Sequence, residues 1–373
     1  MKSKMMQKTF LLGFAVASSV CLLPSLVGAR ATGVCSDCHT MHNSQNGTTM
    51  FGLTAHGALT NGGCVGCHTG DNDGNNNIPY VMQTSEPTYN SADAGTLGDT
   101  LAGGNFYWVA QGGGDATGHN VASISAVDIP IGETPPGWNA EFTGNGLINN
   151  GGAIWTNQLT CAGTNGCHGD HTATNDWDAV AGAHHGDDGT INGESVAGSF
   201  RFLKGIKGLE DSDWEYQPTS IAHNQYYGID KASDLHAGAD SATISYLCAE
   251  CHGNFHSGTD NLGAVAEDAV VESPWIRHPT DYDMGNVATK LDYAGYGGES
   301  HTYSVIAPVA SDLANGVLNQ VYQNADDAIV TCLSCHRAHG TPFDDLLRWD
   351  YDTCVSAGGD DACGCFECHT TKD

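Results

Sequence analysis

Apolar residues occur along this chain in short clusters, and beyond residue 29 no stretch keeps a helical period or the alternation of a half-buried strand. The segments between clusters are rich in glycine, asparagine, aspartate, serine and threonine, and glycine alone supplies 49 of 373 residues, about twice its usual share. A short apolar segment covers residues 200–209, and a short helix is expected at residues 311–319. Such a chain has too little apolar surface to offset the conformational entropy of folding. The pattern predicts an irregular, loop-rich fold with short helices and little sheet.

The first 29 residues differ from the rest of the chain. Three lysines precede a largely apolar stretch at residues 10–26, and small residues follow at positions 27–29. This order is typical of a secretory signal peptide, so we expect residues 1–29 to be removed and residues 30–373 to form a single exported domain. Lipid attachment at Cys21 is an alternative, which Val20 before it disfavours. No later segment reaches the roughly 18 apolar residues of a membrane-spanning helix, so no membrane span is expected.

Five segments share two cysteines separated by two residues and followed at once by histidine. They are Cys35-Ser-Asp-Cys38-His39, Cys64-Val-Gly-Cys67-His68, Cys248-Ala-Glu-Cys251-His252, Cys332-Leu-Ser-Cys335-His336 and Cys365-Phe-Glu-Cys368-His369. One further, wider segment reads Cys161-Ala-Gly-Thr-Asn-Gly-Cys167-His168. It lies third along the chain, so the six motifs are numbered one to six in chain order. This is the attachment signature of c-type haem, in which two thiols bond the porphyrin and the next imidazole binds the iron. Structural zinc is the alternative, but it gives no reason for a histidine after every second cysteine. For the wide segment, a disulfide or a free thiol pair is also open.

Six covalently bound haem c groups would supply the apolar surface that the chain lacks. We therefore expect one domain wrapped around a linear array of six haems, with the histidines of the six motifs as the proximal iron ligands. Two cysteines remain outside the signal and the motifs, and in an exported protein Cys354 and Cys363 are expected to form a disulfide. In an alternative attachment register, Cys363 and Cys368 would bond the last haem, and Cys365 would remain unattached.

Each iron also needs a ligand on its other face. Past the signal, the chain has four methionines but twelve histidines outside the motifs, which favours histidine on both faces of every iron. The candidate distal ligands are His42, His119, His256, His278, His301 and His339. Six histidines are held in reserve, namely His56, His171, His184, His185, His223 and His236. The adjacent pair His184-His185 is expected to supply at most one ligand.

The charge of the chain narrows its possible partners. The formal net charge is -30 at pH 7, and removal of the signal lysines would make the remainder still more negative. Such a charge repels nucleic acid and anionic lipid, and it attracts cations, basic proteins and positively charged mineral surfaces. We expect no nucleic-acid partner, and we expect other redox cytochromes or extracellular metal oxides as electron acceptors.

Several segments give the chain a resemblance to a known family. They are CSDCHTMHNS at residues 35–44, Gly118-His119-Asn120, Arg277-His278-Pro279, CLSCHRAHG at residues 332–340, and the terminal residues 365–373. Together they resemble the outer-surface hexahaem c-type cytochromes that polymerise into nanowires, the OmcS-like and OmcE-like cytochromes. The wide spacing of Cys161 and Cys167 departs from the usual linker. The resemblance implies haems in alternating stacked and perpendicular pairs. It also implies that His42 ligates a haem of the next subunit, which gives a head-to-tail homopolymer.

The first functional hypothesis is therefore a secreted electron-transfer protein of the outer cell surface, exported through the periplasm and assembled into filaments. It has no enzymatic reaction of its own. A discrete periplasmic electron carrier, in which His42 serves its own chain, is the alternative. A multihaem reductase of a nitrogen or sulfur oxyanion is a second alternative, and it requires one open haem. Binding of carbon monoxide or cyanide separates an open iron from a six-coordinate one.

Overall fold

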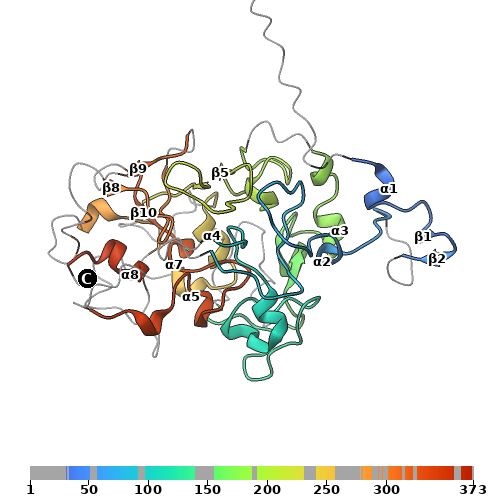
Figure 1. Ribbon diagram of the computed structural model, residues 1–373, viewed down its shortest axis with the longest axis horizontal. Helices are drawn as coiled ribbons and strands as arrows, with labels where there is room; N and C mark the ends of the chain where they lie inside the picture. The colour runs from blue at the N-terminus through green and yellow to red at the C-terminus, as the bar shows by residue number, and fades with distance from the viewer. Residues whose placement is uncertain are drawn as a thin grey trace, which may run out of the picture.

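The computed structural model describes residues 31, 33–50, 57–90, 97–138, 155–186, 191–230, 241–256, 278, 280–287, 293, 296, 301–312, 316–321, 326–356 and 363–371. The predicted signal peptide, His56 and His236 lie outside these residues. In the described part, short helices and two-stranded ladders are joined by long irregular segments (Figure 1). This agrees with the loop-rich architecture that the sequence predicts. No helix in that part is long and apolar enough to cross a membrane.

The five regular motifs fold as short helical turns. Three helices run from the first to the second cysteine, namely α1 (Cys35–Cys38), α2 (Cys64–Cys67) and α7 (Cys332–Cys335). Helix α8 (Gly364–Cys368) begins one residue before its motif, and α4 (Ile244–Ala249) ends inside the fourth motif. In all five, the histidine N–H donates to the carbonyl of the first cysteine at 2.8–3.0 Å. Because residues three and four apart share one helix face, each turn presents both sulfurs and the imidazole on the same side.

The wide motif has a different local structure. Strand β3 (Thr160–Ala162) carries its first cysteine, and strand β4 (Gly166–His168) carries the second cysteine and the histidine. The two strands pair in parallel, and the 3-10 turn η3 (Gly163–Asn165) connects them. Glycine is required at position 166, because a Cβ there would lie 2.4 Å from the Ala162 nitrogen. The longer linker therefore folds into a tight loop.

The remaining regular elements are also short. Helices α3 (Asp176–Ala179) and α5 (Gly253–His256) have one turn each. The antiparallel ladders pair β1 (Ser44–Gln45) with β2 (Thr48–Thr49), β5 (Gly208–Leu209) with β6 (Gln225–Tyr226), β7 (Tyr282–Asp283) with β10 (Ile329–Val330), and β8 (His301–Thr302) with β9 (Gln320–Val321).

The predicted helix at residues 311–319 is wrong for the residues described there, which are irregular. Long-range hydrogen bonds hold the backbone of this segment to residues 225 and 226. The Ser311 N–H donates to the Tyr226 carbonyl at 3.0 Å, and the Leu318 N–H donates to Gln225 Oε1 at 3.0 Å. The apolar segment at residues 200–209 forms the 3-10 turn η5 (Phe200–Phe202) and strand β5. The disulfide expected between Cys354 and Cys363 is present, with Cα atoms 5.3 Å apart.

Apolar side chains gather in separate clusters instead of one continuous core. The largest described cluster contains Trp155, Phe200, Leu203, Ile206, Tyr226, Ile244, Leu247, Cys251, Ala310 and Ile329. Motif cysteines also pack beside the smaller clusters, with Cys161 at one, Cys368 at another, and Cys335 and Cys365 at a third. The apolar clusters therefore lie next to the attachment motifs.

One carboxyl group is buried in β7. Asp283 is 4% exposed, and its Oδ1 accepts a hydrogen bond from the Gly285 N–H at 2.5 Å. Burial raises the pKa of Asp283 to about 7, and the carboxylates of Asp230, Asp326 and Asp327 add to the rise. The fold therefore favours the neutral form of this side chain below that pH.

Candidate haem-binding sites

Five of the six motif histidines face a second histidine at nearly the same distance. The ring centroids of these pairs are 6.0–6.4 Å apart. The pairs are His39 with His185, His68 with His184, His168 with His339, His252 with His119, and His369 with His278. The repeated distance indicates one common arrangement at five places.

This distance fits two imidazoles that share one iron. A metal–nitrogen bond of about 2 Å on each side, together with the radius of each ring, places the two centroids about 6 Å apart. The two sulfurs beside each motif histidine complete the donor set of a c-type haem. The residues present therefore fit a haem with histidine on both faces of its iron.

Hydrogen bonds fix the orientation of the motif imidazoles. The Nδ1–H groups donate to backbone carbonyls at 2.7–3.0 Å in five of the motifs. These five histidines and their acceptors are His39 with Ala58, His68 with Pro79, His168 with Arg201, His252 with Pro136, and His336 with Asp345. A carbonyl accepts only, so Nδ1 carries the proton and Nε2 keeps its lone pair for a metal.

Burial keeps several of these imidazoles neutral. It lowers the pKa of His168 and of His252 to about 4, and that of His339 to about 3. Burial likewise lowers the pKa of His68 and of His119. Because the neutral imidazole is the form that binds a metal, these sites are prepared for ligation near neutral pH.

The distal candidates His119 and His339 are held side by side by glycine-rich backbone. The His119 N–H donates to the His339 carbonyl at 3.2 Å, and its Nδ1–H donates to the Ala338 carbonyl at 2.8 Å. The His339 N–H donates to the Gly103 carbonyl at 2.7 Å. The ring of His339 stacks on Phe106 at 4.8 Å. One local structure thus presents imidazoles to the third and fourth motifs.

The adjacent pair His184-His185 contributes two imidazoles, where the sequence suggested at most one. Both lie in the 3-10 turn η4 (Ala183–His185). His184 faces the second motif and His185 faces the first. With three residues in each turn of a 3-10 helix, successive side chains point in different directions. That geometry lets neighbouring residues reach two motifs.

The fifth motif and His42 differ from the five pairs. His336 is exposed, and its ring faces no other imidazole among the described residues. His42 is also exposed, and the described part of the chain offers it no hydrogen bond or ring contact. Figure 1 shows α1 and the β1–β2 hairpin, which flank His42, at one end of the long axis. Helix α7, which precedes His336, lies in the half that contains the C-terminus. Within the described part of the chain, one motif histidine and one exposed histidine are thus left without an imidazole partner.

Four other candidate histidines make different contacts. His256 lies 2.8 Å from Asp281 Oδ2, and His301 stacks on Tyr296 at 4.5 Å. The two reserves His171 and His223 are buried, and their Nε2 atoms donate to the carbonyls of Cys167 and Leu318. The structure therefore does not bring His171, His223, His256 or His301 opposite a motif histidine.

Arg337, the residue after the fifth motif, ties that motif to the segment 89–102. Its guanidinium is buried and donates to the carbonyls of Asn90, Leu101 and Ala102 at 2.8–3.2 Å. Its Nε–H donates to the Tyr89 hydroxyl at 2.9 Å. The long segment between the second and third motifs is thereby fastened over the fifth motif.

Successive motifs are neighbours in space. The sulfurs of Cys64 and Cys161 lie within 4.8 Å of each other, and the thiols of Cys248 and Cys332 are hydrogen-bonded. In the other successive motifs the interaction is electrostatic: in addition to burial, Cys38 raises the pKa of Cys67, Cys167 that of Cys251, and Cys365 that of Cys335. The attachment sites therefore follow one another in the order of the sequence.

Repeated attachment motifs with paired imidazoles define a multihaem c-type cytochrome. The model of the doubled CXXCH motif family matches residues 325–373, which contain the last two motifs. The chain is 24% identical to the C-type cytochrome OmcS of Geobacter sulfurreducens over 421 aligned positions, which cover 96% of this chain and 90% of that protein. This match confirms the resemblance to the OmcS-like nanowire cytochromes.

Two solved structures are also similar to this chain. One is the Outer Membrane Cytochrome S filament from Geobacter sulfurreducens, with a TM-score of 0.41, 19% identity, and coverage of 89% of this chain and 88% of that chain. The other is a cryo-EM structure of the OmcS nanowires from the same organism, with a TM-score of 0.37, 20% identity, and coverage of 92% and 93%.

Proposed function

We propose that this protein is the subunit of an extracellular cytochrome filament that transfers electrons through six c-type haems with histidine on both faces of each iron. When bound, each haem supplies a one-electron iron couple, and ligation by two histidines keeps its potential low. The observation that carries the proposal is the set of five imidazole pairs with a common spacing. Two imidazoles at each site leave no open position for a substrate, so these five sites favour electron transfer over catalysis.

The distal ligands in this proposal are His185, His184, His339, His119 and His278 for motifs one, two, three, four and six. For the fifth motif the proposed ligand is His42 of a neighbouring copy. Two observations support this assignment. His336 is exposed and its ring faces no other imidazole among the described residues, and His42 is exposed between α1 and β1, which lie at one end of the long axis in Figure 1. A contact between two different patches does not close on itself, so its repetition produces a filament.

The spacing of the attachment sites supports conduction along the chain. Cysteine sulfurs meet between the second and third motifs and between the fourth and fifth, and cysteines of the other successive motifs interact electrostatically. The link proposed between His42 and the fifth motif extends this series into the next subunit. The acidic surface, with a formal charge of -30, supports basic redox proteins or metal oxides as the acceptors. The signal-like residues 1–29 support secretion through the periplasm.

The test combines one substitution with two measurements. His42→Ala is expected to keep six haems per chain in a pyridine haemochrome assay and to abolish long assemblies in cryo-electron microscopy. Carbon monoxide is expected to bind about one sixth of the haem in this variant, because only the fifth iron loses a ligand. The matched control is His301→Ala, which removes another histidine and is expected to keep the filaments.

Other results point to the alternatives. Filaments that persist in His42→Ala contradict the cross-subunit ligand. Compact wild-type particles with six haems indicate a discrete electron carrier. Rapid carbon monoxide binding by assembled wild-type protein indicates an open iron and favours the reductase.

A further inference from the structure

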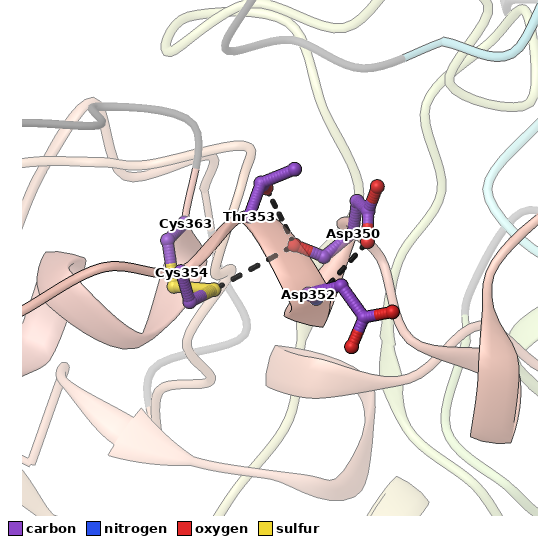
Figure 2. The surroundings of a disulfide bond; sticks show 5 residues. All are labelled: Asp350, Asp352, Thr353, Cys354 and Cys363. Atoms are coloured by element: carbon purple, nitrogen blue, oxygen red, sulfur yellow. Dashed lines mark hydrogen bonds between the residues drawn. A yellow bond between two sulfur atoms is a disulfide. The ribbon is translucent and has the colours of Figure 1, made fainter.

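Three cysteine sulfurs meet beside the last attachment motif. The Sγ atoms of Cys354, Cys363 and Cys365 all lie within 4.8 Å of one another. Cys354 and Cys363 form the disulfide that Figure 2 shows, whereas Cys365 is the first cysteine of the motif. Cys363 is 1% exposed and directly precedes α8, the helix that carries Cys365 and Cys368. A third sulfur therefore lies within reach of the position where the first thioether of this motif is expected.

Cys363 belongs to a second possible attachment frame. It is separated from Cys368 by four residues, and Cys368 is followed at once by His369. The chain's own third motif has five residues between Cys161 and Cys167, so a frame wider than two residues lies within the range that this chain uses. The spacing alone therefore does not decide whether Cys363 or Cys365 would bond the porphyrin.

The disulfide decides the choice chemically. A thioether forms when a thiol adds across a vinyl double bond, with the sulfur bonding one carbon and the thiol proton going to the other. No electrons are gained or lost in this addition. A disulfide sulfur carries no proton to add, so Cys363 cannot react while it is bonded to Cys354. Cys365 is then the sole thiol available at the first position of the motif.

The packing around the disulfide holds this arrangement in place. Cys363 lies in one buried cluster with Trp349 and Ala307. A Cβ at Gly364 would lie 2.2 Å from the Trp349 ring, so the indole packs directly on the backbone between the two competing cysteines. On the other side of the bond, the Cys354 sulfur lies 3.7 Å from the Asp350 carbonyl (Figure 2).

We propose that the Cys354–Cys363 disulfide selects the attachment register of the last haem by withholding Cys363 from thioether formation. This inference rests on the proposed attachment of haem at the last motif. It assigns the disulfide a role in cofactor attachment, distinct from any part in electron transfer.

Two single substitutions test the proposal because both remove the same disulfide. Cys354→Ser leaves Cys363 as a free thiol, whereas Cys363→Ser removes the competitor. The purified haem-loaded proteins are alkylated, digested, and mapped by tandem mass spectrometry across residues 354–371. In Cys354→Ser, we expect a fraction of the chains to carry haem on Cys363 and Cys368, with Cys365 alkylated. In Cys363→Ser and in the wild type, all of the haem is expected on Cys365 and Cys368.

A second pair of variants keeps the test decisive if the first pair accumulates poorly. Cys365→Ser with the disulfide intact is expected to hold its last haem through a single thioether, at Cys368. Cys354→Ser combined with Cys365→Ser is expected to recover a second thioether, at Cys363. Identical maps for Cys354→Ser and Cys363→Ser, including equal loss of the last haem, overturn the proposal. A wild-type peptide without haem overturns the proposed haem site itself, so the two failures are distinguishable.

Discussion

Replacing Gly103 by alanine tests whether His339 ligates the third haem. The backbone of Gly103 lies against the His339 ring, and a Cβ at this position would be 2.6 Å from Nδ1, 2.9 Å from Cε1 and 3.0 Å from Cγ. Gly103 does not have a positive φ angle, so alanine adds a methyl group without backbone strain. The substitution therefore acts on the imidazole through the added methyl alone.

The size of the displacement can be worked from these distances. Ordinary van der Waals contact begins at 3.4 Å, so the ring must retreat by about 0.8 Å from its 2.6 Å contact. A metal site tolerates deviations of only about 0.2 Å in its bond lengths. Retreat is restricted because the ring stacks on Phe106 and the His339 N–H is bonded to the Gly103 carbonyl. We therefore expect the bond between His339 and its iron to break.

The assay is carbon monoxide binding to the reduced protein, followed by visible spectroscopy. Gly103→Ala is expected to bind carbon monoxide at about one sixth of its haem and to show a matching high-spin fraction. The control is Gly316→Ala, because a Cβ at Gly316 meets no atom within 4 Å. A Gly103→Ala protein that stays fully low-spin and binds no carbon monoxide would refute the assignment of His339.

Two further predictions concern the stability of the fold. Arg337→Met removes the guanidinium donor of the Asn90 and Ala102 carbonyls, whereas the Leu101 carbonyl keeps the Gly104 N–H, and at about 1–3 kcal/mol for each lost bond we expect a loss of at least about 2 kcal/mol in urea unfolding. An unchanged midpoint contradicts this expectation. For Asp283, the fold raises the pKa from 3.8 to about 7, so its stabilising contribution is present below pH 4 and is lost as the pH rises through 7. The penalty at high pH is at most about 4 kcal/mol. Asp283→Asn should therefore raise the Tm at pH 8 but not at pH 4, whereas the exposed Asp352→Asn should change neither. Equal changes in the Tm of Asp283→Asn at pH 4 and pH 8 would contradict this prediction.

The two cysteines and the histidine of each regular motif are brought together by local chain geometry. Two cysteines three residues apart and a histidine one residue later share a face of a helical turn, so the regular motifs could be predicted as units. The sequence also indicated that histidines outnumber the motifs. The first inference depends only on residues close together in the chain, and the second depends only on composition.

The second histidine of each site could not be predicted in the same way, because it depends on which distant segment of the chain packs against the motif. His256, four residues after His252, has the spacing of a ligand for a neighbouring haem, but its ring pairs with Asp281. Conversely, His184 and His185 are expected from the sequence to supply at most one ligand between them. Their 3-10 turn begins after Gly182, whose φ of 75° favours glycine, and it directs the two rings to different motifs. No local sequence pattern distinguishes these outcomes.

The positions of the proposed distal histidines also bear on how the spacing of the attachment sites is maintained in a chain with so little regular structure. His184 and His185 are consecutive, so their Cα atoms are about 3.8 Å apart and the first two sites are linked through one peptide bond. The backbones of His119 and His339 are hydrogen-bonded, which links the third and fourth sites in a similar way. Between these linked pairs, the second site meets the third, and the fourth meets the fifth, through neighbouring cysteine sulfurs. Histidine-side and sulfur-side links therefore alternate over the first five sites. Because each link joins two sites directly, the distances between these neighbouring sites are set at the links themselves and not by the full length of the segments that connect the motifs.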